Sequence, residues 1–185
     1  MRVLPTSLPG VFVVAPQIHR DGRGLFCESW RLDHFGQAGL GDTWVQINFC
    51  RSRKGVVRGL HLQDHRAPQV RLVQCTHGAV WDVVVDVRVD SPTRGRHVAM
   101  ELTGDNLLQV RVPEGFAHGF LALTDEAEVR YLCSSPWCPQ AEQAIRWDDP
   151  DLAIPWPVAA PIVSDRDRGA RSFREWCGAG WPHGH

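Results

Sequence analysis

The stretch AVWDVVVDVRV, residues 79–89, decides the fold class because its side chains alternate between two faces. One face is wholly apolar and the other mixes valines with charged residues. The apolar face holds Trp81, Val83, Val85, Val87 and Val89, and the mixed face holds Val80, Asp82, Val84, Asp86 and Arg88. A period of two is that of a β-strand. We therefore predict a strand that turns one face to a hydrophobic core.

Short runs of the same kind recur along the chain, each bounded by Gly, Pro, Asp or Ser. They are VFVVAPQ from residue 11, TWVQINF from 43, QVRLVQC from 69, HVAMELT from 97, LLQVRVP from 107, GFLALT from 119 and EVRYLCS from 128. Only WRLDHFGQAG, from residue 30, predicts a short helix. Many short strands without intervening helices are typical of an antiparallel sandwich or jelly-roll barrel. The sequence therefore predicts an all-β fold with a few short helices.

Length and composition indicate one domain. A chain of 185 residues is long enough to bury most of its apolar surface in a single core, and no low-complexity linker divides it. We expect one domain over residues 1–185. The tail from about residue 140 is rich in Trp, Pro and Asp, and we expect it to wrap the barrel.

The charge of the chain argues against nucleic-acid and membrane partners. The formal net charge is -1 and the pI is near 6.7, so no overall field attracts polyanions. The N-terminus lacks the apolar region of a signal peptide, and no run approaches a membrane span. We expect a cytoplasmic protein. The six cysteines form no CxxC pair, so we expect reduced thiols that take no part in the chemistry.

The stretch VRGLHLQDH, residues 57–65, fits a metal site, a proton-transfer site or a well-satisfied piece of core. In a regular strand, Arg58 and His61 point to opposite faces. A metal site needs three or four ligands. The later motif PEGFAH, residues 113–118, adds only His118 to this set. We therefore expect no metal.

Other clusters carry polar groups suited to catalysis or to phosphate binding. Tyr131 is the only tyrosine beside eight Trp and seven Phe, although a core or rim position explains it without chemistry. Asp165 or Asp167 of SDRDR can orient a histidine, or lie solvated in a loop. Arginines beside glycines in DGRGLFCES, residues 21–29, and QINFCRSRKG, residues 46–55, permit close bidentate phosphate contact. Exposed turns explain these arginines equally well.

Taken in order, these clusters resemble dTDP-4-dehydrorhamnose 3,5-epimerases, cupin-fold enzymes that act on nucleotide-linked 4-keto-6-deoxyhexoses. The motifs keep their order from about residue 4 to residue 173: DGRGLFCES, QINFCRSRKGVVRGLHLQ, VWDVVVDVRVDSPT, VPEGFAHGFLAL, EVRYLCS, IRWDDPDLAIPWP and SDRD. The resemblance implies a cupin-like jelly roll and an isomerase that needs no metal or redox cofactor. It also implies a homodimer with exchanged N-terminal strands, in which Arg23 and Glu28 serve the partner's site.

Inverting a carbon beside a ketone requires a base, a group that stabilises the enolate, and an acid on the opposite ring face. The resemblance implies that His61, paired with Asp167, is the base and that Tyr131 is the acid. Unperturbed imidazoles and phenols titrate near pH 6.5 and about 10, values that suit these roles. The resemblance further implies substrate contacts from Arg23, Glu28, Gln46, Asn48, Arg58 and His118.

One position departs from the family pattern. Most relatives have lysine where this chain has Arg71, and the resemblance implies that this residue stabilises the enolate. Arginine keeps the charge but is wider and planar. We predict epimerisation of dTDP-4-dehydro-6-deoxy-D-glucose at C3 and C5. The alternatives are a C3-only epimerase of a dTDP-4-keto-6-deoxyhexose in secondary metabolism, an inactive nucleotide-sugar-binding protein, and a metal-dependent cupin enzyme that uses His61, His65 and His118.

Overall fold

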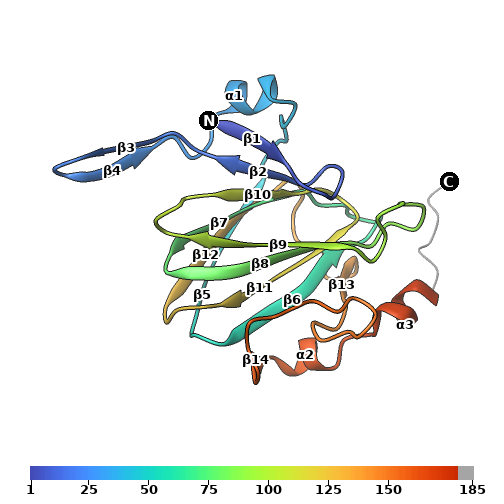
Figure 1. The fold of residues 1–185 in the computed structure, drawn as a ribbon. Helices are drawn as coiled ribbons and strands as arrows, with labels where there is room; N and C mark the ends of the chain where they lie inside the picture. Colours follow the sequence, from blue (N-terminus) through green and yellow to red (C-terminus); the bar gives the residue numbers. More distant parts are fainter. Residues whose placement is uncertain (179–185) are drawn as a thin grey trace.

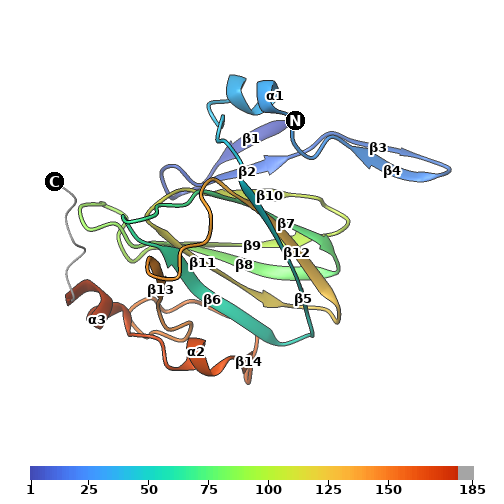
Figure 2. The ribbon, with the colours of Figure 1, turned by 180° about the vertical axis from the view of Figure 1, so that it is seen from behind.

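Two β-sheets face each other in the computed structural model, which describes residues 1–178 (Figures 1 and 2). The first sheet has the order β1 (Arg2–Pro5), β2 (Phe12–Ala15), β10 (Gln109–Val112), β7 (Arg71–His77), β12 (Ala127–Cys133) and β5 (Gln46–Ser52). The second has the order β13 (Glu142–Ala144), β6 (Val56–Gln63), β11 (Phe116–Ala122), β8 (Ala79–Asp86) and β9 (His97–Thr103). All of these neighbours pair antiparallel. The prediction of an all-β, antiparallel fold is confirmed.

Strand β8 buries both of its faces. Val80 and Val84, on the mixed face, belong to the hydrophobic core between the sheets. Val83 and Val85, on the apolar face, pack instead against Trp176 and other residues of the C-terminal segment. The prediction that this strand turns only one face to a core is therefore wrong. The mixed face lines the interior, because the all-apolar face is needed to seat the tail on the outside of the sheet.

The C-terminal segment runs along the outside of the second sheet, next to β6 (Figure 1). It contains β14 (Ile162–Val163), which pairs in parallel with β6, then α2 (Asp165–Arg168) and α3 (Phe173–Gly178). Ser164 caps α2, since its hydroxyl accepts the backbone N–H of Asp167 at 3.1 Å. This cap holds Asp167 beside β6. Within the part of the chain that the structure describes, no helix is long and apolar enough to cross a membrane.

The N-terminal region adds a helix and a projecting hairpin. Helix α1 (Leu32–Gln37) lies within the predicted helical stretch, and its Phe35 packs with Leu72 on the outer face of the first sheet. Strands β3 (Ile18–Asp21) and β4 (Gly24–Cys27) form a hairpin that extends away from both sheets (Figures 1 and 2). We call residues 18–27 the arm. The side chain at its most exposed apolar position, Phe26, is 70% exposed.

Candidate active site

A cavity of about 540 Å³ opens between the two sheets beside the first half of β6. Its walls are formed by Cys50, Val56, Val57, Arg58, His61, Arg71, His118, Phe120, Tyr131, Ile162, Val163, Ser164, Arg166 and Asp167. The structure thus brings together six of the residues proposed from sequence, namely Arg58, His61, Arg71, His118, Tyr131 and Asp167. Cys50, Phe120 and Arg166 were not foreseen, because no local pattern distinguishes them from other strand or helix residues.

An irregularity in β6 directs both Arg58 and His61 into this cavity. His61 pairs with His118 and Arg58 pairs with Phe120, so three steps along β6 match two steps along β11. The expectation that Arg58 and His61 point to opposite faces is therefore wrong. Gly59 makes the irregularity possible, because its φ is +135° and a Cβ there would lie 2.6 Å from the Cα of Gly119.

His61 and Asp167 form a hydrogen-bonded dyad on one wall of the cavity. His61 Nε2 lies 2.6 Å from Asp167 Oδ1, and the two side chains are 25% and 5% exposed. Burial raises the pKa of the Asp167 carboxyl, but the hydrogen bond and charge of His61, with the N–H of Gly59, outweigh burial and hold the pKa below its ordinary value. An ionised carboxylate only accepts hydrogen bonds, so Nε2 carries the proton.

The other ring nitrogen of His61 is the one that can act as a base. With the proton on Nε2, the lone pair of the imidazole lies on Nδ1. This atom has no hydrogen-bond partner among residues 1–178. The dyad can therefore accept a proton from a molecule in the cavity and stabilise the resulting imidazolium with the Asp167 carboxylate.

Tyr131 enters the cavity from the first sheet, which forms the facing wall. Burial raises the pKa of the Tyr131 phenol above its ordinary value, and the positive charge of Arg71 offsets this only in part. The guanidinium carbon of Arg71 lies 6.0 Å from the centre of the Tyr131 ring. The phenol is therefore protonated at neutral pH and can donate a proton.

Arg71 brings a partly buried positive charge to the same cavity. Its Nε donates to Gln69 Oε1 at 2.9 Å and its Nη1 donates to the carbonyl oxygen of His61 at 3.3 Å. Among residues 1–178, no carboxylate forms an ion pair with it. Burial lowers the pKa of the guanidinium, yet arginine stays charged. A partly buried cation with no ion-pair partner among these residues favours an anion in the cavity.

His118 has a carboxylate partner that the sequence did not reveal. Its Nε2 lies 2.8 Å from Asp82 Oδ2, and the two side chains are 7% and 0% exposed. Within residues 1–178, the second oxygen of Asp82, Oδ1, has no hydrogen-bond partner. Burying a carboxylate is costly unless it has a partner, and His118 is the partner of Asp82. The signal was present as an aspartate on the mixed face of β8, whose role became visible only once that face was found inside.

Four residues proposed from sequence are not among the residues that form the cavity walls. The side chain of Arg23, in the arm, is 91% exposed, and Glu28 follows the arm and is 44% exposed. Gln46 and Asn48 hydrogen-bond to each other at 2.9 Å on β5, the edge strand of the first sheet. Asn48 lies directly opposite Tyr131 on the neighbouring strand. The arm residues therefore do not reach the cavity of their own chain.

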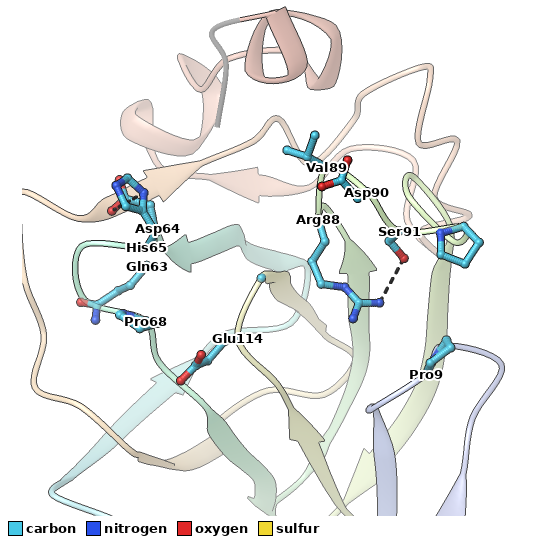
Figure 3. A pocket seen from close by; sticks show the side chains of 12 residues that line it. Pro9, Gln63, Asp64, His65, Pro68, Arg88, Val89, Asp90, Ser91 and Glu114 are labelled. Atoms are coloured by element: carbon cyan, nitrogen blue, oxygen red, sulfur yellow. Dashed lines mark hydrogen bonds and ion pairs between the residues drawn. The ribbon is translucent and has the colours of Figure 1, made fainter. Parts of the chain in front are cut away.

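A second hollow, of about 690 Å³, lies beyond the carboxyl end of β6 (Figure 3). Gln63, Asp64, His65 and Pro68 line one side of it, and Arg88–Ser91 line the other. His65 thus borders a different hollow from His61 and His118. Nowhere in residues 1–178 do three His, Cys, Asp or Glu side chains gather as metal ligands. His61, His65 and His118, the ligands of the metal-dependent alternative, therefore do not form such a group among the described residues.

Proton transfer is the chemistry that the groups of the first cavity support together. The dyad can take a proton from one side of a bound molecule, and the phenol can supply one from the other side. The fold and the site therefore define a jelly-roll protein of the enzyme class, with a cavity equipped for acid–base catalysis.

Comparison with known proteins gives the particular family. The family model for dTDP-4-dehydrorhamnose 3,5-epimerase matches residues 5–175. The dTDP-4-dehydrorhamnose 3,5-epimerase of Mycobacterium tuberculosis is 44% identical over 180 residues, which cover 95% of this chain and 89% of the relative. The chain belongs to this family of isomerases, and the resemblance drawn from its motifs is confirmed.

Two solved structures extend the likeness to the whole fold. NovW, a 4-keto-6-deoxy sugar epimerase from the novobiocin biosynthetic gene cluster of Streptomyces spheroides, is 40% identical with a TM-score of 0.95, covering 98% of this chain and 92% of that one. ChmJ, a 3'-monoepimerase from Streptomyces bikiniensis solved with dTDP-quinovose, is 38% identical with a TM-score of 0.89, covering 95% and 90%. The cupin-like jelly roll is therefore shared with enzymes of deoxysugar chemistry.

Proposed function

We propose that this protein epimerises a dTDP-linked 4-keto-6-deoxyhexose, dTDP-4-dehydro-6-deoxy-D-glucose, at C3 and C5 through an enolate. The observation that carries the proposal is the placement of His61, hydrogen-bonded to Asp167 of α2, and of the Tyr131 phenol on the two facing sheets of one cavity. Inversion requires removal of a proton from one ring face and its return to the other. Family membership and the names of the relatives support the substrate class.

Each step of the proposed reaction has a group in the cavity. Nδ1 of His61 removes the proton next to the ketone, and Asp167 stabilises the imidazolium that forms. The charge that develops on the ketone oxygen is stabilised by Arg71, whose guanidinium is already fixed and desolvated. Tyr131 then protonates the carbon from the opposite face, and its raised pKa keeps that proton available. All four roles are filled by side chains of this chain.

The diphosphate and the nucleoside need contacts that lie further out. Arg58 lines the cavity and is exposed enough to meet a phosphate, while His118 faces the sugar region from β11. Gln46 and Asn48 on the edge strand, with Arg23 and Glu28 near the arm, complete the proposed substrate contacts. Arg23 and Glu28 reach a cavity only if the arm crosses to a second copy of the chain.

A homodimer with exchanged arms is therefore part of the proposal. Exposed apolar side chains support it, since Phe26 of the arm is 70% exposed and Ile47 and Phe49 on the edge strand are 64% and 58% exposed. Such a surface is costly in water and typical of an interface. Phe26→Asp and Phe49→Asp should each produce monomers in analytical ultracentrifugation. A dimer that persists in both variants would argue against this assembly.

A C3-only epimerase is the second candidate function. Two observations favour it: the likeness to ChmJ, a 3'-monoepimerase, and the presence of Arg71. The guanidinium is wider than an ammonium and is hydrogen-bonded to the protein, so it places the ketone oxygen differently. The two candidates share every step at C3 and differ only in whether the C5 proton also reaches the base.

Proton NMR in deuterated buffer tests both candidates. The purified protein is mixed with dTDP-4-dehydro-6-deoxy-D-glucose, and the C3 and C5 signals are followed over time. Loss of both signals supports double epimerisation, whereas loss of the C3 signal alone supports the C3-only enzyme. Tight binding without any exchange would support the non-catalytic alternative and contradict the proposal. A parallel sample treated with a chelator should exchange at the same rate.

A further inference from the structure

Neutral groups alone hold the Arg71 side chain within residues 1–178. Of its five N–H bonds, one on Nε points to Gln69 Oε1 at 2.9 Å and one on Nη1 points to the carbonyl oxygen of His61 at 3.3 Å. Neither partner neutralises the guanidinium. The remaining N–H bonds are left for a molecule in the cavity, so the angle at which they point matters for any ligand that Arg71 binds.

Gln69 fixes that angle through a contact outside the cavity. The residue is only 8% exposed, and its Nε2 donates to the carbonyl oxygen of Ser135 at 2.7 Å. A carbonyl only accepts, so the amide nitrogen must face Ser135 and the amide oxygen must face Arg71. Ser135 is itself held, because its hydroxyl donates to the carbonyl oxygen of Pro68 at 2.8 Å. The side-chain amide of Gln69 is therefore oriented in one way only.

We propose that Gln69 is a positioning residue of the reaction: with Ser135 it aims the Arg71 guanidinium at the oxygen that becomes negative. The inference rests on the proposed function. Arginine has a long side chain, and an ordered partner at Nε removes much of its freedom before substrate binds. A lysine has no Nε–H, so it lacks the donor that Gln69 holds in this structure. Gln69 and Arg71 thus form a unit that works only together.

Gln69→Met removes both hydrogen bonds and keeps a side chain of similar length. We expect kcat to fall by about tenfold or more, the factor typical of losing a hydrogen bond to a charged group, with little change in KM. Gln74→Met is the matched control. Gln74 is a buried glutamine on β7, the strand that carries Arg71, and it also joins an arginine to a carbonyl, accepting from Arg130 at 3.0 Å and donating to Leu107 at 3.2 Å. Its replacement should lower the melting temperature without lowering kcat.

A double-mutant cycle separates positioning from general damage. In an Arg71→Lys background, Gln69→Met should change kcat by less than about twofold, because lysine lacks the Nε–H that Gln69 holds in place. A direct readout comes from the Nε–H signal of Arg71 in proton–nitrogen NMR, identified by its loss in Arg71→Lys. The hydrogen that gives this signal should exchange with water faster in Gln69→Met than in the unchanged protein. The measurement does not depend on whether Arg71→Lys is active.

Several results would overturn the inference. These are an unchanged kcat in Gln69→Met, an equal loss in Gln74→Met, an equal loss in the lysine background, or an Nε–H signal that does not respond to Gln69→Met. Turnover by the unchanged protein is measured in the same series. A failure of the proposed reaction appears in that sample, and a failure of the positioning role appears only among the variants.

Discussion

Asp167→Asn should disable the base without removing a large side chain. Gly59 donates its N–H to Asp167 Oδ2 at 3.3 Å, so an asparagine keeps its oxygen on that side and turns its NH₂ group toward His61. Nε2 of His61 must then accept a hydrogen bond, which moves the ring proton to Nδ1. The nitrogen that faces the substrate loses its lone pair. Both the charge and the tautomer of the dyad are changed by one substitution.

The geometry sets the size of the effect. Opposite unit charges separated by the 2.6 Å between His61 Nε2 and Asp167 Oδ1 interact by roughly 6 kcal/mol at an effective dielectric constant of about 20. Only part of this interaction energy is lost in Asp167→Asn, because asparagine still makes a neutral hydrogen bond to His61. We expect a loss of about 2–4 kcal/mol in the transition state, which corresponds to a fall in kcat of about 30- to 1,000-fold.

The assay is deuterium exchange at C3 under saturating substrate. Asp165→Asn is the matched control, since it makes the same chemical change in the same helix at an exposed position. Thermal melting checks that both proteins fold. The reasoning is refuted if Asp167→Asn exchanges at the rate of the unchanged protein, or if Asp165→Asn falls as far.

Two further predictions concern buried ionisable groups. Although burial raises the pKa of Asp86, hydrogen bonds from Arg88, Ser91 and Thr93 lower it to about 2 from an ordinary 3.8, so the carboxylate stabilises the folded state by about 2 kcal/mol at neutral pH. That stabilisation is present above pH 3.8 and is lost as the pH falls toward 2. In urea unfolding, Asp86→Asn should therefore have a lower free energy of unfolding than the unchanged protein at pH 6, and the difference should shrink by about pH 3. An equal difference at both pH values would contradict the prediction. Tyr131 is the only tyrosine, so the ultraviolet titration of tyrosinate reports it alone; its midpoint should lie above 10 because of burial, and higher still in Arg71→Met, which removes the charge that lowers it. A midpoint at or below 10 in the unchanged protein would contradict the burial of the phenol.

The strands were predictable because their residues alternate and their ends carry turn formers. The same alternation misassigned the faces of β8, since a local pattern shows that a face is apolar but not what covers it. Trp176 supplies part of that cover from more than eighty residues away in sequence, together with nearer parts of the tail. The arm was missed as secondary structure because its sequence, IHRDGRGLFC, shows no apolar alternation.

The site was predictable to the extent that its residues lie in recognisable motifs. The pairing of His61 with Asp167 joins two distant motifs, and the fold brings them to 2.6 Å. The joint orientation of Arg58 and His61 was not predictable, since it depends on a register shift between β6 and β11. Asp82 and Gln69 were missed for a related reason: their roles come from partners on other strands and loops, which no spacing within one motif reveals.

The central claim is that His61 and Tyr131 serve opposite faces of one sugar ring. Its most direct test is proton NMR of the keto-sugar in deuterated buffer with Tyr131→Phe and His61→Asn, following exchange and inversion at C3 separately. We predict that Tyr131→Phe incorporates deuterium at C3 but returns it to the original face, and that His61→Asn incorporates none. Complete inversion by Tyr131→Phe, or exchange at the normal rate in His61→Asn, would contradict the claim.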